Sequence, residues 1–326
     1  MALAGTVFLP RKNNLALGIM VGGMVGLPIL LRNPYYIGVM VFIGIYCLIT
    51  TGLSLLMGYA GQISIGHAAF YAIGAYTSGL LTTRIGFPPL LSILVAILLS
   101  AFIAYLIGMP TLRLRGHYLA MATLGFGEIV YIFLTASVGF TGGPSGFGEI
   151  PRIALGSLVV ESQLARYCLI WTLVVIGLIF SLNIIYSRVG RALRAIHGSE
   201  LAASAMGVNT ARYKIQVFVL SAVYASVAGS LYAHFVTFIS PSSFTLHFSI
   251  LLVTMVVVGG MSNVWGALMG TVLLGLLPEM LRGFRDYDIL IYGFVLLGIL
   301  MFMPDGLFGI AGRLGGFVRR TGDKRE

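Results

Sequence analysis

The chain has 326 residues, of which 58% are hydrophobic and 9% are charged, and its mean hydropathy is +0.99. A soluble domain carries about 25% charged residues, so this composition excludes a soluble enzyme and predicts an all-α polytopic membrane protein, with residues 1–326 forming a single transmembrane domain. The net charge of +10 does not indicate nucleic acid as a partner, because the cations lie between apolar runs, where anionic membrane lipid and the excess of positive charge in cytoplasmic loops account for them.

The first apolar run, 15–31, follows Arg11 and Lys12 and is similar to a signal peptide in outline. It is followed by Arg32 and not by a small-residue cleavage site. We therefore expect a first helix that stays in the membrane.

Further apolar runs are long enough to cross a bilayer, which takes about 20 residues of helix. In all, the pattern predicts about eight to ten spans. The run 248–281 is interrupted by G-G-M-S-N at 259–263, which favours either two short helices or one span and a re-entrant piece. The predicted spans are 15–31, 36–58, 62–82, 90–109, 117–139, 167–186, 214–239, 248–264, 265–281 and 287–303.

The segment 58–77 reads G-Y-A-G-Q-I-S-I-G-H-A-A-F-Y-A-I-G-A-Y-T. It opens with turn residues, and we expect Ser64 to cap the helix that follows, with Gln62, Gly66 and His67 beside the cap. A helix amino terminus inside the membrane attracts a carboxylate, so these residues are candidates for a translocation pathway. The alternative is that they only satisfy backbone groups at a kink between packed helices.

Glu128 lies in the middle of an apolar run, L-G-F-G-E-I-V-Y. An ionisable side chain is costly there, which makes Glu128 a second candidate for the pathway, where it would meet a substrate ammonium group. By residue type, His67 is its nearest potential partner. A protonated and purely structural Glu128 is the alternative.

Two sets of glycines recur every four residues: Gly18, Gly22 and Gly26, and then Gly266 and Gly270. This spacing gives a helix a flat face on which another helix can approach closely. We expect these faces to serve packing, within the chain or with a second subunit, and not chemistry.

A long polar stretch at 187–213 separates two apolar runs. The basic residues in it and at its end are Arg188, Arg191, Arg194, Arg212 and Lys214. Such a stretch cannot lie in hydrocarbon, and its charge predicts a cytoplasmic loop. This placement puts most of the 20 lysines and arginines on the same side, including a basic tail at 311–326, and predicts that both termini are cytoplasmic.

From Arg191 onward the polar stretch is expected to form a short helix along the inner membrane surface, which Gly207 or Asn209 would end. The residues spaced to share its apolar side are Leu193, Ile196, Leu201 and Ala205. The small residues of this helix favour tight docking against a groove in a partner protein, which would supply the energy that a pore-like chain lacks.

Enzyme signatures are missing from the sequence. No phosphate-binding loop ending in G-K-[ST] and no H-E-x-x-H motif occurs. The G-P-S-G at 143–146 matches the short motif of rhomboid-type intramembrane proteases, but it falls in a polar outer loop, which leaves an intramembrane enzyme as a distant alternative. No catalytic residue, metal or cofactor is expected.

Four dispersed motifs resemble those of LivM-type permeases, which are branched-chain amino acid subunits of ABC importers. They are the stretch 58–81, L-R-L-R-G-H-Y-L-A-M-A-T-L-G-F-G-E-I at 112–129, T-G-G-P-S-G at 141–146 and G-G-M-S-N-V-W-G-A at 259–267. The run E-L-A-A-S-A-M-G at 200–207 also resembles the E-A-A-x-x-x-G coupling motif of such permeases, with its acid one position early. The candidate ATPase-coupling residues are therefore Arg191, Arg194, Glu200, Leu201, Ala202, Ala203 and Gly207.

The resemblance implies a transporter subunit in a bacterial inner membrane that takes up branched-chain amino acids by using ATP hydrolysis in separate subunits. The implied partners are a LivH-like second permease in a heterodimer, two cytoplasmic ATP-binding subunits, and a periplasmic or lipid-anchored substrate-binding protein. A permease for urea or short amides is the rival within this class. An autonomous channel or an ion-coupled secondary transporter is the rival from another class.

Overall fold

The computed structural model describes residues 11–30, 33–112, 114, 116–155, 158–159, 162–281, 288–302 and 306–307. The predicted basic tail at 311–326 lies outside the described residues. Within the described residues the chain is almost entirely helical, which confirms the all-α class. Two strands of two residues each, β1 (Ala154–Leu155) and β2 (Leu158–Val159), pair antiparallel in one loop.

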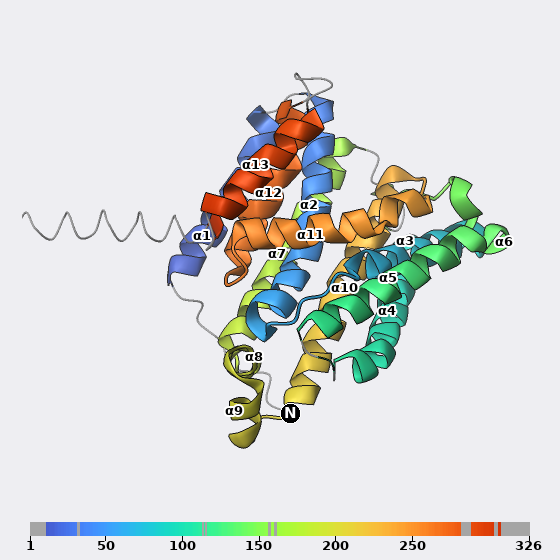
Figure 1. Ribbon diagram of the computed structural model, residues 1–326. Helices are drawn as coiled ribbons and strands as arrows, with labels where there is room; N and C mark the ends of the chain where they lie inside the picture. Colours follow the sequence, from blue (N-terminus) through green and yellow to red (C-terminus); the bar gives the residue numbers. More distant parts are fainter. Residues whose placement is uncertain are drawn as a thin grey trace, which may run out of the picture.

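Figure 1 shows the helices in chain order. They are α1 (Arg11–Leu30), α2 (Pro34–Ser54), η1 (Leu55–Tyr59), α3 (His67–Arg84), α4 (Pro89–Thr111), α5 (His117–Ala136), α6 (Val138–Thr141), η2 (Gly143–Ser145), α7 (Gln163–Tyr186), α8 (Arg188–Gly198), α9 (Glu200–Ala205), α10 (Thr210–Val236), η3 (Pro241–Phe244), α11 (Leu246–Gly259), α12 (Val264–Leu281) and α13 (Asp288–Phe302).

Seven helical segments in the described part of the chain are long and apolar enough to cross a bilayer. They are Pro34–Tyr59, Pro89–Thr111, His117–Ala136, Gln163–Tyr186, Thr210–Val236, Pro241–Gly259 and Val264–Leu281. The multi-pass membrane architecture expected from composition is therefore confirmed. The interrupted run at 248–281 forms two helices, α11 and α12, separated by a turn, which was one of the two arrangements that the sequence favoured.

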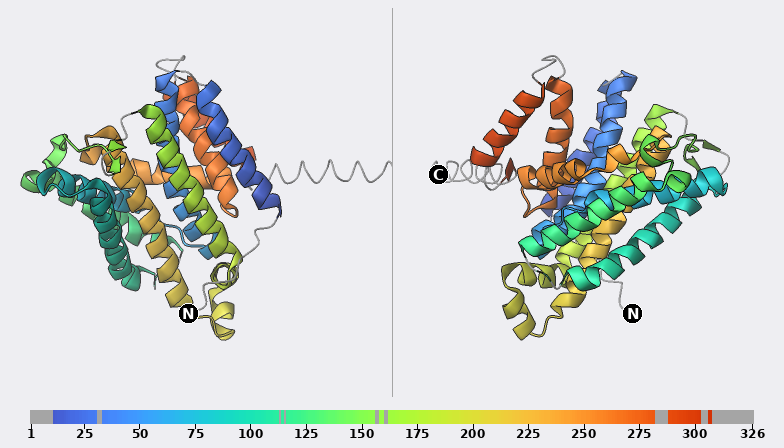
Figure 2. Two further views of the ribbon diagram at one scale, coloured as in Figure 1. Left: turned by 180° about the vertical axis from the view of Figure 1, so that it is seen from behind. Right: turned by 45° about the vertical axis from the view of Figure 1, so that its right-hand side comes forward.

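The spans differ in how much of their surface the protein covers. In the most apolar 18-residue window of Pro34–Tyr59, 83% of the residues are buried, against 22% in α4 and in α5. The central helices α2 and α10 each pack against several others, whereas α4 and α5 lie at the perimeter (Figure 2). Perimeter helices in a membrane can expose leucine and isoleucine because lipid tails are equally apolar.

Glycines bring α3 and α10 into close contact. Gly74 on α3 lies against the backbone of Ser226, and Gly229 on α10 lies against the carbonyl of Tyr71. A Cβ at either glycine would overlap backbone atoms of the facing helix, so any larger residue would force the two helices apart.

The two sets of regularly spaced glycines have different surroundings. Gly266 and Gly270 lie against the backbone of α11, so the packing that their spacing predicts forms within the chain. A Cβ at Gly18, Gly22 or Gly26 would meet no other atom within 4 Å. That face of α1 is therefore not covered by any described part of the chain.

The two ends of the bundle are built differently. Helices α8 and α9 project from one end, at the bottom of Figure 1. Towards the opposite end, Phe147 and Ile239 exchange two backbone hydrogen bonds, each 3.0 Å long, which tie the loop after η2 to the end of α10. These bonds fix the loop against a residue that is distant in the sequence.

Candidate functional site

The helix after α2 does not begin where the sequence predicted. The end of α2 passes into the π-helical turn η1, and residues 61–66 then form a non-helical segment, called the break below, before α3 starts at His67. The predicted span 62–82 is therefore wrong at its amino end. Gly61 has a φ of +67°, a conformation that favours glycine, and from there the chain leads back into the bundle (Figure 1).

His67 is buried and joins the break to α10. Its Nδ1 lies 3.0 Å from Ser64 Oγ, and its Nε2 lies 2.6 Å from Ser221 Oγ. A neutral imidazole donates from one nitrogen and accepts at the other, and a serine hydroxyl can do either. Both ring nitrogens are therefore bonded to serines, and the pairing of His67 with Glu128 that the sequence suggested does not form.

The capping that the sequence predicted for Ser64 is wrong. Gly66 is the N-cap residue of α3 and supplies no side-chain cap, while the Ser64 hydroxyl turns to His67. The physical reason is that the chain remains non-helical for two residues beyond Ser64, so the hydroxyl meets the imidazole of the first helical residue and not a backbone N–H.

Side chains from neighbouring helices satisfy the backbone here instead. Thr123 Oγ1 on α5 accepts a hydrogen bond from the Ile65 N–H at 3.1 Å, and Ser249 Oγ on α11 accepts one from the Ala68 N–H at 3.0 Å. The break is therefore held by polar side chains from α5, α10 and α11, because a backbone donor left unbonded inside a membrane protein is costly.

Glu128 lies where α5 crosses the break. A Cβ at Gly66 would overlap the carbonyl of Thr123, and a Cβ at Gly127 would lie 3.6 Å from the Cα of Gly66. Glu128, the next residue, is half-buried and forms no hydrogen bond or ion pair with any described residue. Glu128 thus follows the residue of α5 that touches the break, and its carboxyl group has no partner among the described residues.

Gln62 is the most isolated polar group of the break. Its side chain is only 3% exposed, and neither the amide nitrogen nor the amide oxygen has a hydrogen-bond partner among the described residues. Unpaired buried amides are rare because desolvation is not compensated. This amide can donate to and accept from a bound molecule.

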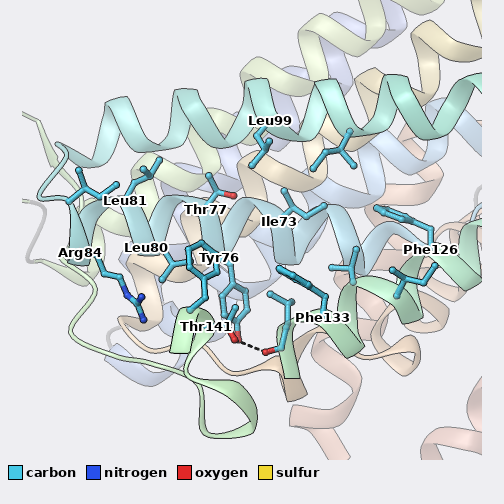
Figure 3. Close-up of a pocket in the computed structure, with 16 residues that line it drawn as sticks. Ile73, Tyr76, Thr77, Leu80, Leu81, Arg84, Leu99, Phe126, Phe133 and Thr141 are labelled. Atoms are coloured by element: carbon cyan, nitrogen blue, oxygen red, sulfur yellow. Dashed lines mark hydrogen bonds between the residues drawn. The ribbon is translucent and has the colours of Figure 1, made fainter. Parts of the chain in front are cut away.

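A hollow between α3, α4 and α5 is apolar, unlike the break. It encloses 470 Å³ and is lined almost entirely by aliphatic and aromatic side chains, with Arg84 towards one end (Figure 3). The hydrogen bond drawn in Figure 3 joins two residues that line the hollow: the Thr141 hydroxyl donates to the backbone carbonyl of Leu134, and the bond is buried. None of the pathway candidates lines this hollow, which offers little to orient a polar substrate.

The helix expected from Arg191 is in fact two helices that meet at Ser199. Leu193 and Ile196 on α8 are buried, whereas Leu201 on α9 is 70% exposed. The prediction that these residues share one apolar side with Ala205 is therefore wrong. Ser199 is extended and caps α9 by accepting a hydrogen bond from the Ala202 N–H, and this interruption changes the direction in which the α9 side chains point.

The helix ends at Gly207, one of the two residues, with Asn209, that the sequence predicted for its end. Gly207, with a φ of +82°, terminates α9, and Asn209 caps the start of α10 by accepting a hydrogen bond from the Arg212 N–H at 3.1 Å. Within α9, Ala203 is buried and Ala202 is exposed. Met206, at the tip, is 85% exposed.

Glu200 points towards the membrane helices. Its Oε1 lies 2.9 Å from the Nζ of Lys214 on α10, whose side chain is buried. Lys214 also donates to the carbonyl of Leu112 at the end of α4, over 3.2 Å. One ion pair thus fastens α9 to two membrane helices, although the sequence analysis had treated Lys214 only as a loop cation.

The two arginines proposed for ATPase coupling lie on different sides of α8. Arg191 lines an open groove of 700 Å³ that reaches Met206 and Arg212. Arg194 donates to the carbonyl of Ile185 at 3.0 Å and lines a separate cavity of 320 Å³ against η1. Only Arg191 therefore faces the surface that the tip of α9 borders.

The family model described as branched-chain amino acid transport system / permease component matches residues 35–303. The chain belongs to this family. The permease is 34% identical over 287 residues to the high-affinity branched-chain amino acid transport system permease protein LivM of Escherichia coli, which covers 81% of the chain and 67% of that relative.

The permease also resembles the second type of subunit. It is 27% identical over 288 residues to the permease protein LivH of Escherichia coli, covering 81% of the chain and 91% of LivH. A probable LivM of Methanocaldococcus jannaschii is 22% identical over 318 residues, covering 82% and 92%. No solved structure matches the chain.

Sequence reasoning missed several side chains that form hydrogen bonds in and beside the break. Thr123, Ser221 and Ser249 hold the break, yet single serines and threonines are common in membrane helices and give no signal of their own.

Proposed function

We propose that the chain is the membrane-spanning permease subunit of an ABC importer that takes up branched-chain amino acids, driven by ATP hydrolysis in separate cytoplasmic subunits. The observation that carries this proposal is the α8–α9 segment. It projects from one end of the bundle, is fastened to α4 and α10 through Glu200 and Lys214, and exposes the apolar side chains of Leu201 and Met206.

This segment has the properties of a docking element. Exposed apolar side chains at the tip of a short, anchored helix are typical of a surface that a partner covers. The groove beside it carries Arg191 and other arginines, which would meet acidic groups of an ATP-binding subunit. Two such subunits would dock, one on this chain and one on its partner permease.

The second permease would be LivH-like. The chain resembles both LivM and LivH over most of its length, and two related subunits can pair about an approximate twofold axis. The pathway would then involve the break, where the Gln62 amide and the Glu128 carboxyl lack partners within the described part of the chain. A periplasmic or lipid-anchored binding protein would deliver the substrate at the opposite end.

We place both termini on the same side of a bacterial inner membrane as the α8–α9 segment, the cytoplasm, and two contacts support this common side. Asn13, near the start of α1, donates to the hydroxyl of Tyr186, the last residue of α7 and two residues before α8 begins. Gly306, near the end of the described chain, packs against Gly260 in the turn that also contacts Gly58 beside α8.

The test begins with co-purification of the tagged chain from its native membrane and identification of the proteins that accompany it. The proposal expects two ATP-binding subunits and a second permease. The purified assembly is then placed in liposomes with the binding protein and labelled leucine, isoleucine, valine or urea. ATP-dependent uptake of the amino acids supports the proposal, uptake of urea alone favours the short-amide rival, and transport by the isolated chain without ATP favours a channel or secondary transporter.

A further inference from the structure

A histidine on α8 contacts η1, the π-helical turn that continues α2. His197 Nδ1 donates a hydrogen bond to the carbonyl of Gly58 at 2.9 Å. A Cβ built at Gly61 would lie 3.0 Å from Cδ2 of the same ring. The imidazole therefore rests directly on the backbone that leads into the break, with no intervening side chain.

The other side of this backbone is equally confined. A Cβ at Gly58 would overlap the carbonyl of Met261, in the turn between α11 and α12. The η1 turn is thus held between His197 and the turn between α11 and α12. Closely packed backbone transmits displacement, since it has no flexible side chains to absorb it.

A second anchor joins the same segment to the opposite side of the break. Glu200 on α9 pairs with Lys214 on α10, and Lys214 precedes Ser221 by seven residues, about 10 Å along one face of the helix. Ser221 is the residue that bonds His67. The His197–Gly58 contact therefore leads to the segment that carries Ser64, and the Glu200–Lys214 pair leads to α10, which carries Ser221.

We propose that His197 is a positioning residue that passes a displacement of the α8–α9 segment to the break, with the Glu200–Lys214 pair as the second point of attachment. A partner that moves α8 and α9 shifts η1 relative to α10 and so acts on the Ser64–His67–Ser221 hydrogen bonds. This inference rests on the proposed function, because it requires a partner that moves the segment.

The test uses the complete transporter in liposomes and measures ATP hydrolysis and amino acid uptake on the same sample. His197→Leu provides a side chain of similar size without the donor, whereas His197→Asn keeps an N–H donor near the position of Nδ1. We expect His197→Leu to lower the uptake per ATP hydrolysed about tenfold, as the loss of one hydrogen bond between moving parts allows, with hydrolysis within about twofold of wild type. His197→Asn should recover much of the uptake.

The matched control is His247→Leu, at an exposed histidine near the start of α11, which should leave the uptake per ATP unchanged. An unchanged ratio in His197→Leu would overturn the inference. Loss of the ATP-binding subunits from the purified His197→Leu complex, or a lower unfolding temperature that His197→Asn does not restore, would assign His197 to docking or folding and would also overturn it. A wild-type complex without ATP-driven uptake would overturn the proposed function as well, so the two failures are distinguishable.

Discussion

The break and the α8–α9 segment are both interruptions between apolar helices, but the break buries polar groups, whereas the α8–α9 segment exposes apolar ones. In the break, polar groups are buried, and three neighbouring helices supply hydrogen-bond partners for them. In the α8–α9 segment, apolar groups at the tip are exposed to solvent. In the first region the chain itself packs and bonds the backbone and His67, with the Gln62 amide left unpaired, whereas the apolar tip of the second region is buried only when a partner covers it.

The largest effect is expected from a side chain in the break. Gly66→Ala would place a Cβ against the Thr123 carbonyl, and backbone atoms cannot move aside as a flexible side chain does. We expect a loss of about 3 kcal/mol in the free energy of unfolding, measured as a lower unfolding temperature in detergent.

Gly198→Ala is the matched control for this comparison, because a Cβ at Gly198 on α8 meets no atom within 4 Å. It should unfold at or slightly above the wild-type temperature, since alanine favours a helix more than glycine does. Equal unfolding temperatures for the two variants would contradict the tight packing of the break.

The ion pair between Glu200 on α9 and Lys214 on α10 should give the next largest effect. Glu200→Gln leaves the buried ammonium group of Lys214 with a neutral partner, and we expect a loss of about 2 kcal/mol. The double variant Glu200→Gln with Lys214→Met removes both charges and should recover most of that loss. A double variant as unstable as the single one would show that the charge of Lys214 is not what Glu200 compensates.

A smaller loss is expected from one hydrogen bond in the break. Ser221→Ala removes the hydroxyl that lies 2.6 Å from His67 Nε2 and leaves a buried ring nitrogen without a partner. We expect a loss of about 1 kcal/mol, because hydrogen bonds between membrane helices are modest. Ser204→Ala on α9, whose hydroxyl bonds only to its own helix, should change the unfolding temperature much less.

The sequence predicted most of the membrane architecture because a span is defined by its own residues. Apolar length located the helices, and glycine predicted the end of α9 at Gly207 and the close contacts of Gly266 and Gly270. What it could not predict depends on partners distant in the chain. The turn of Ser64 towards His67, and the roles of Ser221 and Ser249, follow from how α3, α10 and α11 meet.

The interruption at Ser199 was also beyond the reach of periodicity. A continuous helix from Arg191 would have placed Leu193, Ile196 and Leu201 on one side, and each has the expected apolar character. The extended backbone of Ser199 breaks that register, so the first two are buried and Leu201 is exposed. A single capping serine is enough to separate residues that hydropathy alone groups together.

The smallest effect on stability, and the sharpest test of the comparison, is expected at the tip of α9. Leu201→Ser and Met206→Ser replace side chains that are largely exposed in the chain alone, so each should change the free energy of unfolding by less than about 0.5 kcal/mol. The same variants should reduce the amount of ATP-binding subunit that co-purifies, because each removes apolar area that only a partner can bury. Leu193→Ser is the matched control in α8: its side chain is buried in the chain itself, so it should lower the unfolding temperature before any partner is added. If Leu201→Ser instead destabilises the isolated chain as much as Leu193→Ser does, the tip of α9 belongs to the fold, and the contrast between a break packed by the chain itself and a segment covered by a partner does not hold.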